Sequence, residues 1–334
     1  MKKTVFILVL LILLFVIFTF YPKTAKNTEQ TAHFWQVQSI DTMKYSRDVA
    51  REKLGDASFD RIIDRQTRDI ADTKATHVAI GTPYDDEFLP FLKRWVSTAR
   101  EYKLKVWFRG NWSGWEKWFG YKSIDRKTHI EKTIKFILEN ADLFEDGDIF
   151  TSCNECENGG PGDPRHNGDA LGHREFLIDE YNATRNAFEK IGKKVASNYN
   201  SMNGDVANLI MDKETTKALG GIVVVDHYVG SPEQLIIDIK MLSRKSGGKI
   251  VLGEFGAPIP DIHGKMNEEG QSGWIEEVLQ NLFNLEDVIG LNYWTNVGSS
   301  TQLWDAKGNP RPAVEIIKRY YKENLSRFPQ DIQY

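Results

Sequence analysis

The sequence has too few cysteines and too even a charge balance for several common classes of protein. Two cysteines in 334 residues cannot build a multi-disulfide scaffold, and a chain of this length can bury a core without one. Lysine and arginine number 43 against 47 aspartate and glutamate, which gives a net charge of −4. We therefore expect no nucleic-acid partner. Hydrophobic residues make up 41% of the chain and charged residues 27%, which excludes a disordered or fibrous protein.

Long hydrophobic runs are also scarce, and the clearest one stands at the N-terminus. Lys2 and Lys3 precede an apolar segment over residues 5–21, which is typical of a signal peptide or of a single membrane anchor. The two lysines predict that the following domain lies outside the cytoplasm. We interpret residues 1–21 as this signal or anchor and the polar residues 22–32 as a short tether. The protein is expected to be secreted, or held at the extracellular face of the membrane if the segment is uncleaved.

From residue 33 onward, a short β-branched run followed by an amphipathic helical pattern recurs eight times. The predicted strands cover residues 34–41, 77–83, 105–111, 149–155, 194–200, 221–228, 249–256 and 288–294. The predicted helices, with apolar residues three and four apart, cover residues 59–74, 88–103, 129–144, 174–192, 205–219, 232–245, 274–285 and 312–325. This succession predicts an α/β fold with a single (β/α)8 barrel over residues 33–325 and a tail over 326–334. An open doubly wound sheet is the alternative, but no glycine fingerprint follows the first strand. We expect the barrel to act as a monomer.

The last residues of each predicted strand are informative, because the active site of such a barrel lies at the carboxyl ends of its strands. The fourth strand ends in Asn154 and Glu155, and the seventh ends with Glu254. Strands four and seven lie roughly across the barrel mouth, so both carboxylates can reach one central cleft. Two carboxyl groups about 5–5.5 Å apart suit retaining glycoside hydrolysis, one as nucleophile and one as general acid/base. A solvated loop glutamate is the alternative for either residue, and it is weaker for a pair at matched strand ends.

This arrangement resembles the large clan of retaining (β/α)8 glycoside hydrolases that includes cellulases, mannanases and many β-glycosidases. The resemblance implies that Glu155 is the acid/base and Glu254 the nucleophile. It also implies substrate-binding roles for residues at other strand ends: Asn154 beside the acid/base, His227 or Tyr228 as a hydrogen-bond partner of the nucleophile, and Trp294 as a platform for the sugar.

The chain departs from the clan's pattern at two places. Cys156 follows the Asn-Glu pair where cellulase-like families have proline, and strand two lacks the arginine that many families have at its end. Arg109, at the end of strand three, is the candidate substitute for that arginine. Asn198, near the end of strand five, is a further candidate for sugar contact, and an amide that caps a loop is an equal alternative.

The proposed roles require opposite protonation states in the two glutamates. Glu254 must be ionised, which a donor such as Tyr228 or a nearby guanidinium favours. Glu155 must begin protonated, which burial and the charge of Glu254 favour.

Three tryptophans, Trp112, Trp115 and Trp118, follow strand three at a spacing of three. The glycines between and after them indicate a loop above the mouth, where an indole stacks well on a sugar ring. We expect at least one of them, with Trp112 as the candidate, to contact substrate. A helix face packed on the core is the alternative.

The remaining chemistry-bearing residues predict neither a metal nor a cofactor. The first strand lacks the His-x-His that barrel metallohydrolases have. Cys153 and Cys156 flank the Asn-Glu pair, and a strand would hold them about 10 Å apart, beyond the roughly 4.4–6.8 Å Cα separation of a disulfide. We therefore expect two free thiols, since only a tight turn directly after Glu155 would let them join.

The sequence thus predicts a retaining β-glycoside hydrolase for a β-linked glucan, mannan or related polysaccharide. The first alternative is a non-catalytic carbohydrate-binding barrel, which the presence of both glutamates disfavours. The second is a barrel enzyme of another class, such as an aldolase with a Schiff-base lysine late in a strand. Lys105, Lys194 and Lys249 instead begin predicted strands.

Overall fold

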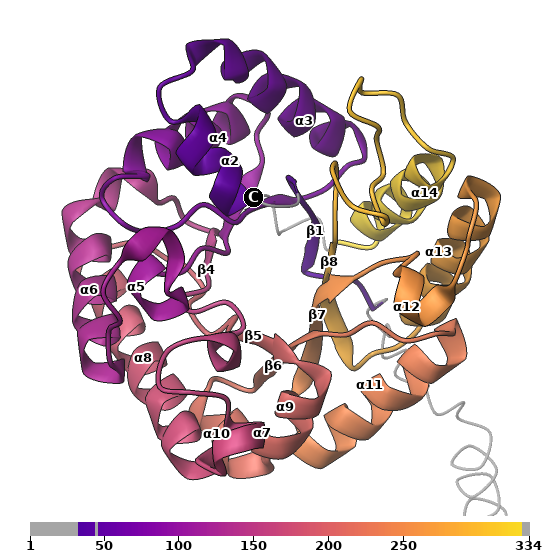
Figure 1. The fold of residues 1–334 in the computed structure, drawn as a ribbon. Helices are drawn as coiled ribbons and strands as arrows, with labels where there is room; N and C mark the ends of the chain where they lie inside the picture. Colours follow the sequence, from indigo (N-terminus) through magenta and orange to yellow (C-terminus); the bar gives the residue numbers. More distant parts are fainter. Residues whose placement is uncertain (1–32, 44–45, 329–334) are drawn as a thin grey trace, which may run out of the picture. The chain divides into compact units, whose positions relative to one another are not determined.

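The computed structural model describes residues 33–43 and 46–328, which form a ring of parallel strands surrounded by helices (Figure 1). The strands are β1 (Val37–Asp41), β2 (His77–Ile80), β3 (Lys105–Phe108), β4 (Ile149–Phe150), β5 (Ser201–Asn203), β6 (Ile222–Asp226), β7 (Lys249–Phe255) and β8 (Val288–Tyr293). They form one eight-stranded sheet in the order β4-β3-β2-β1-β8-β7-β6-β5. An isolated parallel bridge between Ile149 and Ala196 joins β4 to the segment before β5, so the two edges of the sheet meet. We call this rolled sheet the barrel. The predicted α/β class with eight parallel strands is confirmed.

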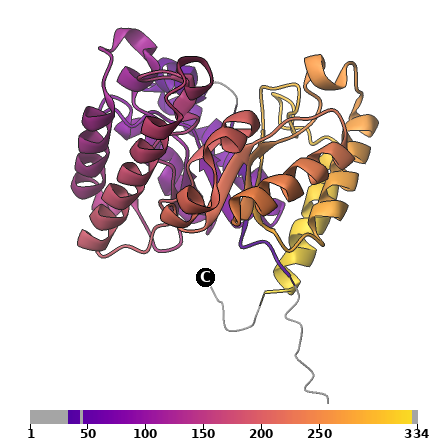
Figure 2. The same cartoon turned by 90° about the horizontal axis from the view of Figure 1, so that it is seen from below.

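Helices stand around the strands, as the side view shows (Figure 2). The longer ones are α3 (Asp60–Asp72), α4 (Leu89–Glu101), α6 (Arg126–Glu139), α8 (Ala170–Lys190), α11 (Pro232–Ser246), α13 (Glu268–Leu282) and α14 (Ala313–Ser326). The shorter ones are α2 (Ser46–Lys53), α5 (Ser113–Glu116), α7 (Pro164–Asn167), α9 (Gly204–Ile210), α10 (Lys213–Ala218) and α12 (Pro260–His263). Asp125, Ser231 and Asn267 cap α6, α11 and α13, each accepting a hydrogen bond from the backbone N–H three residues on.

Alternate strand residues belong to two separate cores. One core fills the barrel with side chains from around the ring: Val37, Ala79, Trp107, Ile149, Tyr199, Val224 and Val251. The other lies between strands and helices and takes residues from the opposite faces of the strands, such as Val106 and Phe108 of β3. Because side chains alternate along a strand, the residues two beyond Trp107 and Val224 are expected to point inward as well. Those residues are Arg109 and Asp226, at the carboxyl end of the barrel.

Most strands are shorter than predicted, and two predicted strands differ from the structure by more than their ends. β4 ends at Phe150 rather than at Glu155, and turns follow it. The predicted strand over 194–200 is wrong: Ala196 makes only an isolated bridge, and β5 starts at Ser201. The predicted helix over 205–219 is divided into α9 and α10, because Asp212 caps a new helix by accepting a hydrogen bond from the Thr215 backbone.

No helix in the described part of the chain is long and apolar enough to cross a bilayer. The predicted signal or anchor over 1–21 and the tether over 22–32 lie outside the described residues.

Candidate active site

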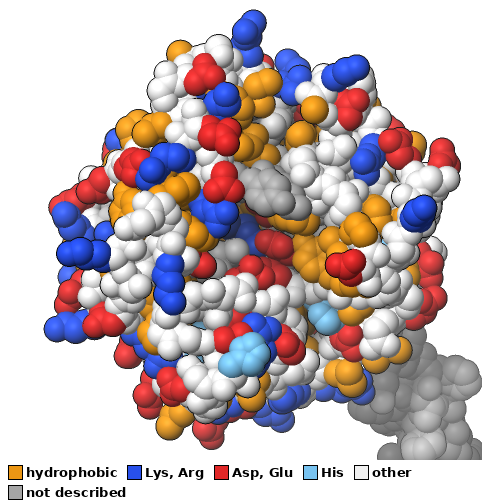
Figure 3. Space-filling view, viewed as in Figure 1, with side chains coloured by type: hydrophobic (Ala, Val, Ile, Leu, Met, Phe, Trp, Pro, Cys, Tyr) orange, Lys and Arg blue, Asp and Glu red, His pale blue; other side chains and the backbone are white. Residues whose placement is uncertain are grey.

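Acidic side chains gather in a hollow at the centre of the barrel mouth (Figure 3). Three carboxylates come from strand ends: Asp41 is the last residue of β1, Asp226 the last of β6 and Glu254 the last but one of β7. Arg109 follows β3 directly. The carboxyl ends of four strands therefore bring three acids and one base to the same place.

Arg109 is buried inside the barrel and bridges these acids. Its guanidinium carbon lies 5.3 Å from the centre of the Trp107 ring, on the interior core. Its Nη2 lies 2.8 Å from Glu254 Oε1 and 3.3 Å from Asp226 Oδ2, and its Nε lies 3.7 Å from Asp41 Oδ2. One guanidinium cation thus faces three carboxyl groups. Which of them are ionised decides which negative charge the guanidinium neutralises.

Burial keeps protons on the two aspartates more strongly than is usual for this residue type. It raises the pKa of Asp41 to about 7, with Arg109 opposing the rise and the charge of Glu254 adding to it. It raises the pKa of Asp226 well above the ordinary value, against the same opposition from Arg109. A protonated Asp226 leaves more of the guanidinium charge for Glu254.

A glycine and an asparagine make room for this cluster and tie it to the strands. A Cβ added at Gly253 would lie 2.3 Å from Asp226 Oδ1, so a larger residue would displace that carboxyl group. Asn292 of β8 donates to Asp41 Oδ2 at 2.8 Å and to the Gly253 carbonyl at 2.9 Å. Asp41 therefore has two partners, Asn292 of β8 and Arg109 after β3.

Glu254 is held by two donors, one at each carboxylate oxygen. Arg109 donates to Oε1 at 2.8 Å, and the Tyr228 hydroxyl donates to Oε2 at 2.9 Å. Burial, together with the charge of Glu254, raises the pKa of Tyr228, so the phenol keeps its proton and stays a donor. The Glu254 side chain is 16% exposed, against 2% for Arg109. Two donors at a partly exposed group suit a carboxylate that meets a ligand from the mouth.

Glu155 lies in the turn after β4 and has a different environment. Burial raises its pKa to about 8, the charges of Glu254 and Glu157 add to the rise, and Arg109 opposes it. Its backbone N–H donates to the Ser201 carbonyl of β5 at 3.0 Å. Glu155 therefore holds its proton to higher pH than an ordinary glutamate, and the charge of Glu254 contributes to this.

Asn154 and Trp294 lie close to this pair. The Ser201 hydroxyl donates to Asn154 Oδ1, which orients the amide beside Glu155. The Trp294 ring, directly after β8, meets Tyr228 edge-on, with ring centres 6.1 Å apart. The structure thus brings together most of the predicted site: Glu155, Glu254, Asn154, Arg109, Tyr228 and Trp294.

Two predicted site residues lie elsewhere. His227 Nε2 pairs with Asp238 Oδ2 of α11 at 2.9 Å, so of the two neighbours at the end of β6 it is the Tyr228 side chain that contacts the Glu254 carboxylate. Asn198 donates to the Leu219 carbonyl in the connection that precedes β6. Because β5 begins at Ser201, Asn198 lies before the strand and not at its carboxyl end.

The tryptophans after β3 pack mostly into the protein. Trp112 is 3% exposed and donates to Thr133 Oγ1 of α6 at 2.9 Å. Trp115 is 1% exposed and stacks on Phe176 of α8. The alternative stated in the sequence analysis, packing on the core, therefore holds for Trp112 and Trp115. Trp118 is only half-buried, with the Arg47 guanidinium 4.7 Å from its ring centre.

The expectation of two free thiols is wrong. Cys153 and Cys156 form a disulfide with Cα atoms 5.3 Å apart. The spacing of about 10 Å applied to an extended strand, whereas Glu155 has φ 47° and ψ 53° and turns the chain sharply between the two cysteines.

Asp41, Asp226 and Asn292 were not identified from the sequence. A signal was present in the sequence, because Asp41 and Asp226 are the last residues of β1 and β6, and Glu254 is the last but one of β7. In the described part of the chain, no cluster of three or more His, Cys, Asp or Glu is arranged to bind a metal ion.

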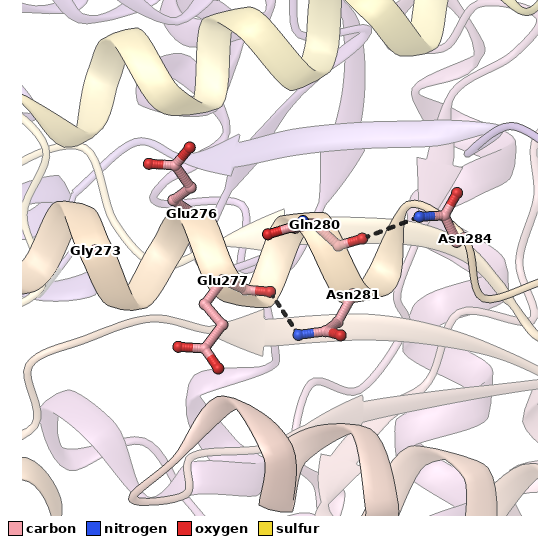
Figure 4. A pocket seen from close by; sticks show the side chains of 6 residues that line it. All are labelled: Gly273, Glu276, Glu277, Gln280, Asn281 and Asn284. Carbon is pink, nitrogen blue, oxygen red and sulfur yellow. Dashed lines mark hydrogen bonds between the residues drawn. The ribbon is translucent and has the colours of Figure 1, made fainter.

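A separate hollow of about 570 Å³ lies along the outside of α13 (Figure 4). Its lining is polar and comes from α13 and the turn that follows it: Gly273, Glu276, Glu277, Gln280, Asn281 and Asn284. Asn281 and Asn284 donate to backbone carbonyls of the same helix. These side chains do not converge on a common point, and none of them belongs to the mouth.

Comparison with known proteins shows a shared fold. No family model and no curated protein sequence matches the chain. Among solved structures, a GH5_18 variant from Bifidobacterium longum subsp. longum in complex with Manβ1-4GlcNAc is similar with a TM-score of 0.62 and 12% identity, covering 88% of this chain and 79% of that one. A fungal β-1,4-galactanase structure is similar with a TM-score of 0.59 and 15% identity, covering 85% of this chain and 99% of that one.

A β-glucuronidase from Ruminococcus gnavus is also similar, with a TM-score of 0.59 and 13% identity over 87% of this chain. This chain spans only 50% of that enzyme's length. The fold of the described residues is thus the (β/α)8 fold found in these glycoside hydrolases.

Proposed function

We propose that this chain is a retaining β-glycoside hydrolase with Glu254 as nucleophile and Glu155 as general acid/base. The observation that carries the proposal is the unequal setting of two neighbouring carboxyl groups. Arg109 and Tyr228 both donate to Glu254, as suits a carboxylate. Burial and nearby negative charge raise the pKa of Glu155 to about 8, as suits an acid. Double displacement requires one carboxyl group that is ionised and one that is protonated.

In the first step, a Glu254 oxygen attacks the anomeric carbon while Glu155 gives its proton to the glycosidic oxygen. The glycosidic bond breaks, the leaving group departs as an alcohol, and a glycosyl ester forms on Glu254. That ester removes the negative charge that helped to raise the pKa of Glu155, so Glu155 can then act as a base. It takes a proton from water, whose oxygen attacks the anomeric carbon and releases Glu254. Two inversions leave the configuration retained.

We propose a β-linked glucan, mannan or related polysaccharide as substrate. The Trp294 indole beside Tyr228 supports this, because aromatic faces stack on sugar rings. The Asn154 amide, oriented by Ser201, has N–H donors that can reach a sugar hydroxyl. The names of similar structures, with a bound Manβ1-4GlcNAc and a β-1,4-galactanase, also refer to β-linked sugars. A panel of aryl β-glycosides and polysaccharides identifies the sugar.

Azide rescue tests the two roles once an aryl substrate is known. In Glu254→Ala the nucleophile is missing, so azide attacks the sugar from the vacated face and yields the glycosyl azide of inverted configuration. In Glu155→Ala an activated aryl glycoside still forms the ester, and azide then yields the retained product. NMR of the two azides reads the outcome. Exchanged configurations would reverse the roles, and wild-type activity in both variants would favour a non-catalytic carbohydrate-binding barrel.

We also propose that the protein is exported and faces the outside of the cell, anchored by residues 1–21 if they are not cleaved. The apolar run after Lys2 and Lys3 supports this, as does the Cys153–Cys156 disulfide, since disulfides persist in oxidising compartments. Protease added to intact cells should digest the barrel, and N-terminal sequencing separates anchor from cleaved signal. A protease-protected protein in the cytosol would contradict export.

A further inference from the structure

The turn that carries Glu155 has an unusual backbone conformation. Glu155 has φ 47° and ψ 53°, in the left-handed region that glycine occupies without cost and that other residues avoid. Glycine is not an option at this position if the carboxyl group is needed for chemistry. A strained conformation of this kind persists only where the surrounding structure holds it.

A disulfide spans this residue. Cys153 and Cys156 lie on either side of Asn154 and Glu155, with Cα atoms 5.3 Å apart, and the two cysteines are 1% and 2% exposed. Between the two cysteines, the closed ring contains only Asn154 and Glu155, and the proposed function places both at the substrate. Because the closed loop is so short, the cross-link removes less entropy from the unfolded chain, and adds less to global stability, than a disulfide that closes a long loop.

The disulfide is itself attached to the segment after β3. Asn111 Nδ2 donates to Cys153 Sγ at 3.7 Å, and Trp115 Nε1 donates to the Cys156 carbonyl at 3.2 Å. Asn111 lies two residues after Arg109, the residue that holds Glu254. The other side of the turn is attached to β5 through the Glu155 N–H and the Ser201 carbonyl. The disulfide therefore links the turn of Glu155 to the same segment that positions the nucleophile.

We propose that the Cys153–Cys156 disulfide is a positioning element for the general acid/base: it keeps Glu155 in the left-handed conformation from which its carboxyl group reaches the glycosidic oxygen. This inference rests on the proposed function. Without the disulfide the barrel folds, Glu254 keeps its two donors, and the turn relaxes so that proton transfer becomes inefficient. The disulfide then serves the acid step and not the stability of the fold.

The test is kinetic and uses leaving groups of graded acidity on the full chain. The double variant Cys153→Ser/Cys156→Ser is compared with wild type on aryl β-glycosides from dinitrophenyl to weakly activated phenyl aglycones. A dinitrophenolate leaves without a proton, so its kcat/KM should fall less than about threefold. For the weakly activated substrate kcat/KM should fall about 30-fold or more, which is part of the roughly 10²–10⁴-fold that general acid catalysis contributes. The basic limb of the pH profile should become shallower for the weakly activated substrate. Glu155→Gln is the reference variant. Its kcat/KM should depend on the leaving group in the same way, with the larger loss that follows from removing the acid itself.

Two outcomes overturn the inference: wild-type rates on all substrates, or an equal loss across all leaving groups, which a general structural role would produce. If the double variant does not fold, wild-type protein treated with a phosphine reductant under native conditions and then reoxidised replaces it, with leaving-group dependence expected to appear on reduction and disappear on reoxidation. A Glu155→Gln variant with wild-type rates on every substrate would instead refute the proposed function itself, so the two failures are distinguishable.

Discussion

The hydrogen bond from Tyr228 to Glu254 can be tested by removing the hydroxyl oxygen of Tyr228. Tyr228→Phe keeps the ring and its edge contact with Trp294 but deletes the hydroxyl that donates to Oε2 at 2.9 Å. Hydrogen bonds to charged groups contribute about 1.5–3 kcal/mol, so we expect kcat to fall roughly 10- to 100-fold. Steady-state kinetics on an activated aryl glycoside measure the loss.

His227→Gln is the matched control for that substitution. The imidazole pairs with Asp238, and the neighbouring Tyr228 side chain is the one that contacts the Glu254 carboxylate. We expect kcat to stay within about twofold of wild type. Any loss should appear in the thermal stability of the protein instead. A larger loss of kcat in His227→Gln than in Tyr228→Phe would contradict the assignment of Tyr228 as the partner of the nucleophile.

The raised pKa of Glu155 predicts how activity depends on pH. Activity needs the protonated acid, so kcat/KM should fall as pH rises through about 8, the value to which burial and the charges of Glu254 and Glu157 raise the pKa. Glu157→Gln removes one of those negative charges while keeping an oxygen to accept from the Asn203 backbone. Ionisation of Glu155 then becomes easier, its pKa falls, and the basic limb should move to lower pH.

Glu131→Gln is the control for the loss of one negative charge away from Glu155. Glu131 is an exposed residue of α6 that pairs with Lys127, and the same loss of one charge there should leave the basic limb unchanged. A basic limb that moves to higher pH in Glu157→Gln, or that does not move at all, would show that Glu155 is not the group that titrates.

At the scale of elements, β4 depends on an aromatic cluster beneath the turn of Glu155. Phe150 is fully buried, and its ring centre lies 5.1 Å from Tyr84 and 5.6 Å from Phe188. Phe150→Ala leaves a cavity there and should lower the free energy of unfolding by about 3–5 kcal/mol in urea titrations. Leu138→Ala, at a leucine of α6 that is 40% exposed, should cost less than about 1 kcal/mol. Equal losses in the two variants would mean that Phe150 is not a core residue.

Periodicity predicted most of these elements correctly, because it depends on local pattern. The β-branched runs of β1, β2, β3, β6, β7 and β8 and the three-and-four spacing of the long helices are visible in short windows of sequence. The exception is the stretch from β4 to β5. There the chain turns at Glu155 because of a disulfide and a hydrogen bond to Ser201, and the second of these partners is distant in sequence. A local pattern does not contain such contacts, so both strand boundaries were wrong.

The candidate site was predictable to the same extent and for the same reason. Glu254 was identified because a barrel brings its strand ends together, and Arg109 and Tyr228 were identified at strand ends from the resemblance to glycoside hydrolases. Trp112 and Asn198 were not placed correctly, because their partners Thr133 and Leu219 lie on other elements. The direction of a side chain beyond a strand end depends on tertiary packing, and sequence spacing does not report it.

At the scale of the whole molecule, the charge of the mouth predicts which sugars it rejects. Asp41, Asp226 and Glu254 occupy the side-chain contacts of the buried Arg109 guanidinium, and Glu155 lies near enough to act on its charge. A sugar carboxylate would find the contacts of this guanidinium taken and would face the carboxylate of Glu254 at short range, which costs several kcal/mol at the dielectric of a protein surface. We expect kcat/KM for an aryl β-glucuronide to be roughly 100-fold or more below that of the best neutral glycoside, despite the fold shared with a β-glucuronidase. A preference for the glucuronide would show that another cation reaches the substrate.

The central claim is that Glu254 forms a covalent bond to the sugar, and mass spectrometry of a trapped intermediate tests it most directly. A dinitrophenyl 2-deoxy-2-fluoro-β-glycoside of the preferred sugar reacts with the nucleophile, but the fluorine slows the release of the ester. We expect the intact mass to rise by one fluoroglycosyl group, the modified peptide to contain Glu254, and Glu254→Gln to remain unlabelled. A label on Glu155, or a turnover that releases the inverted sugar with no covalent species, would contradict the account.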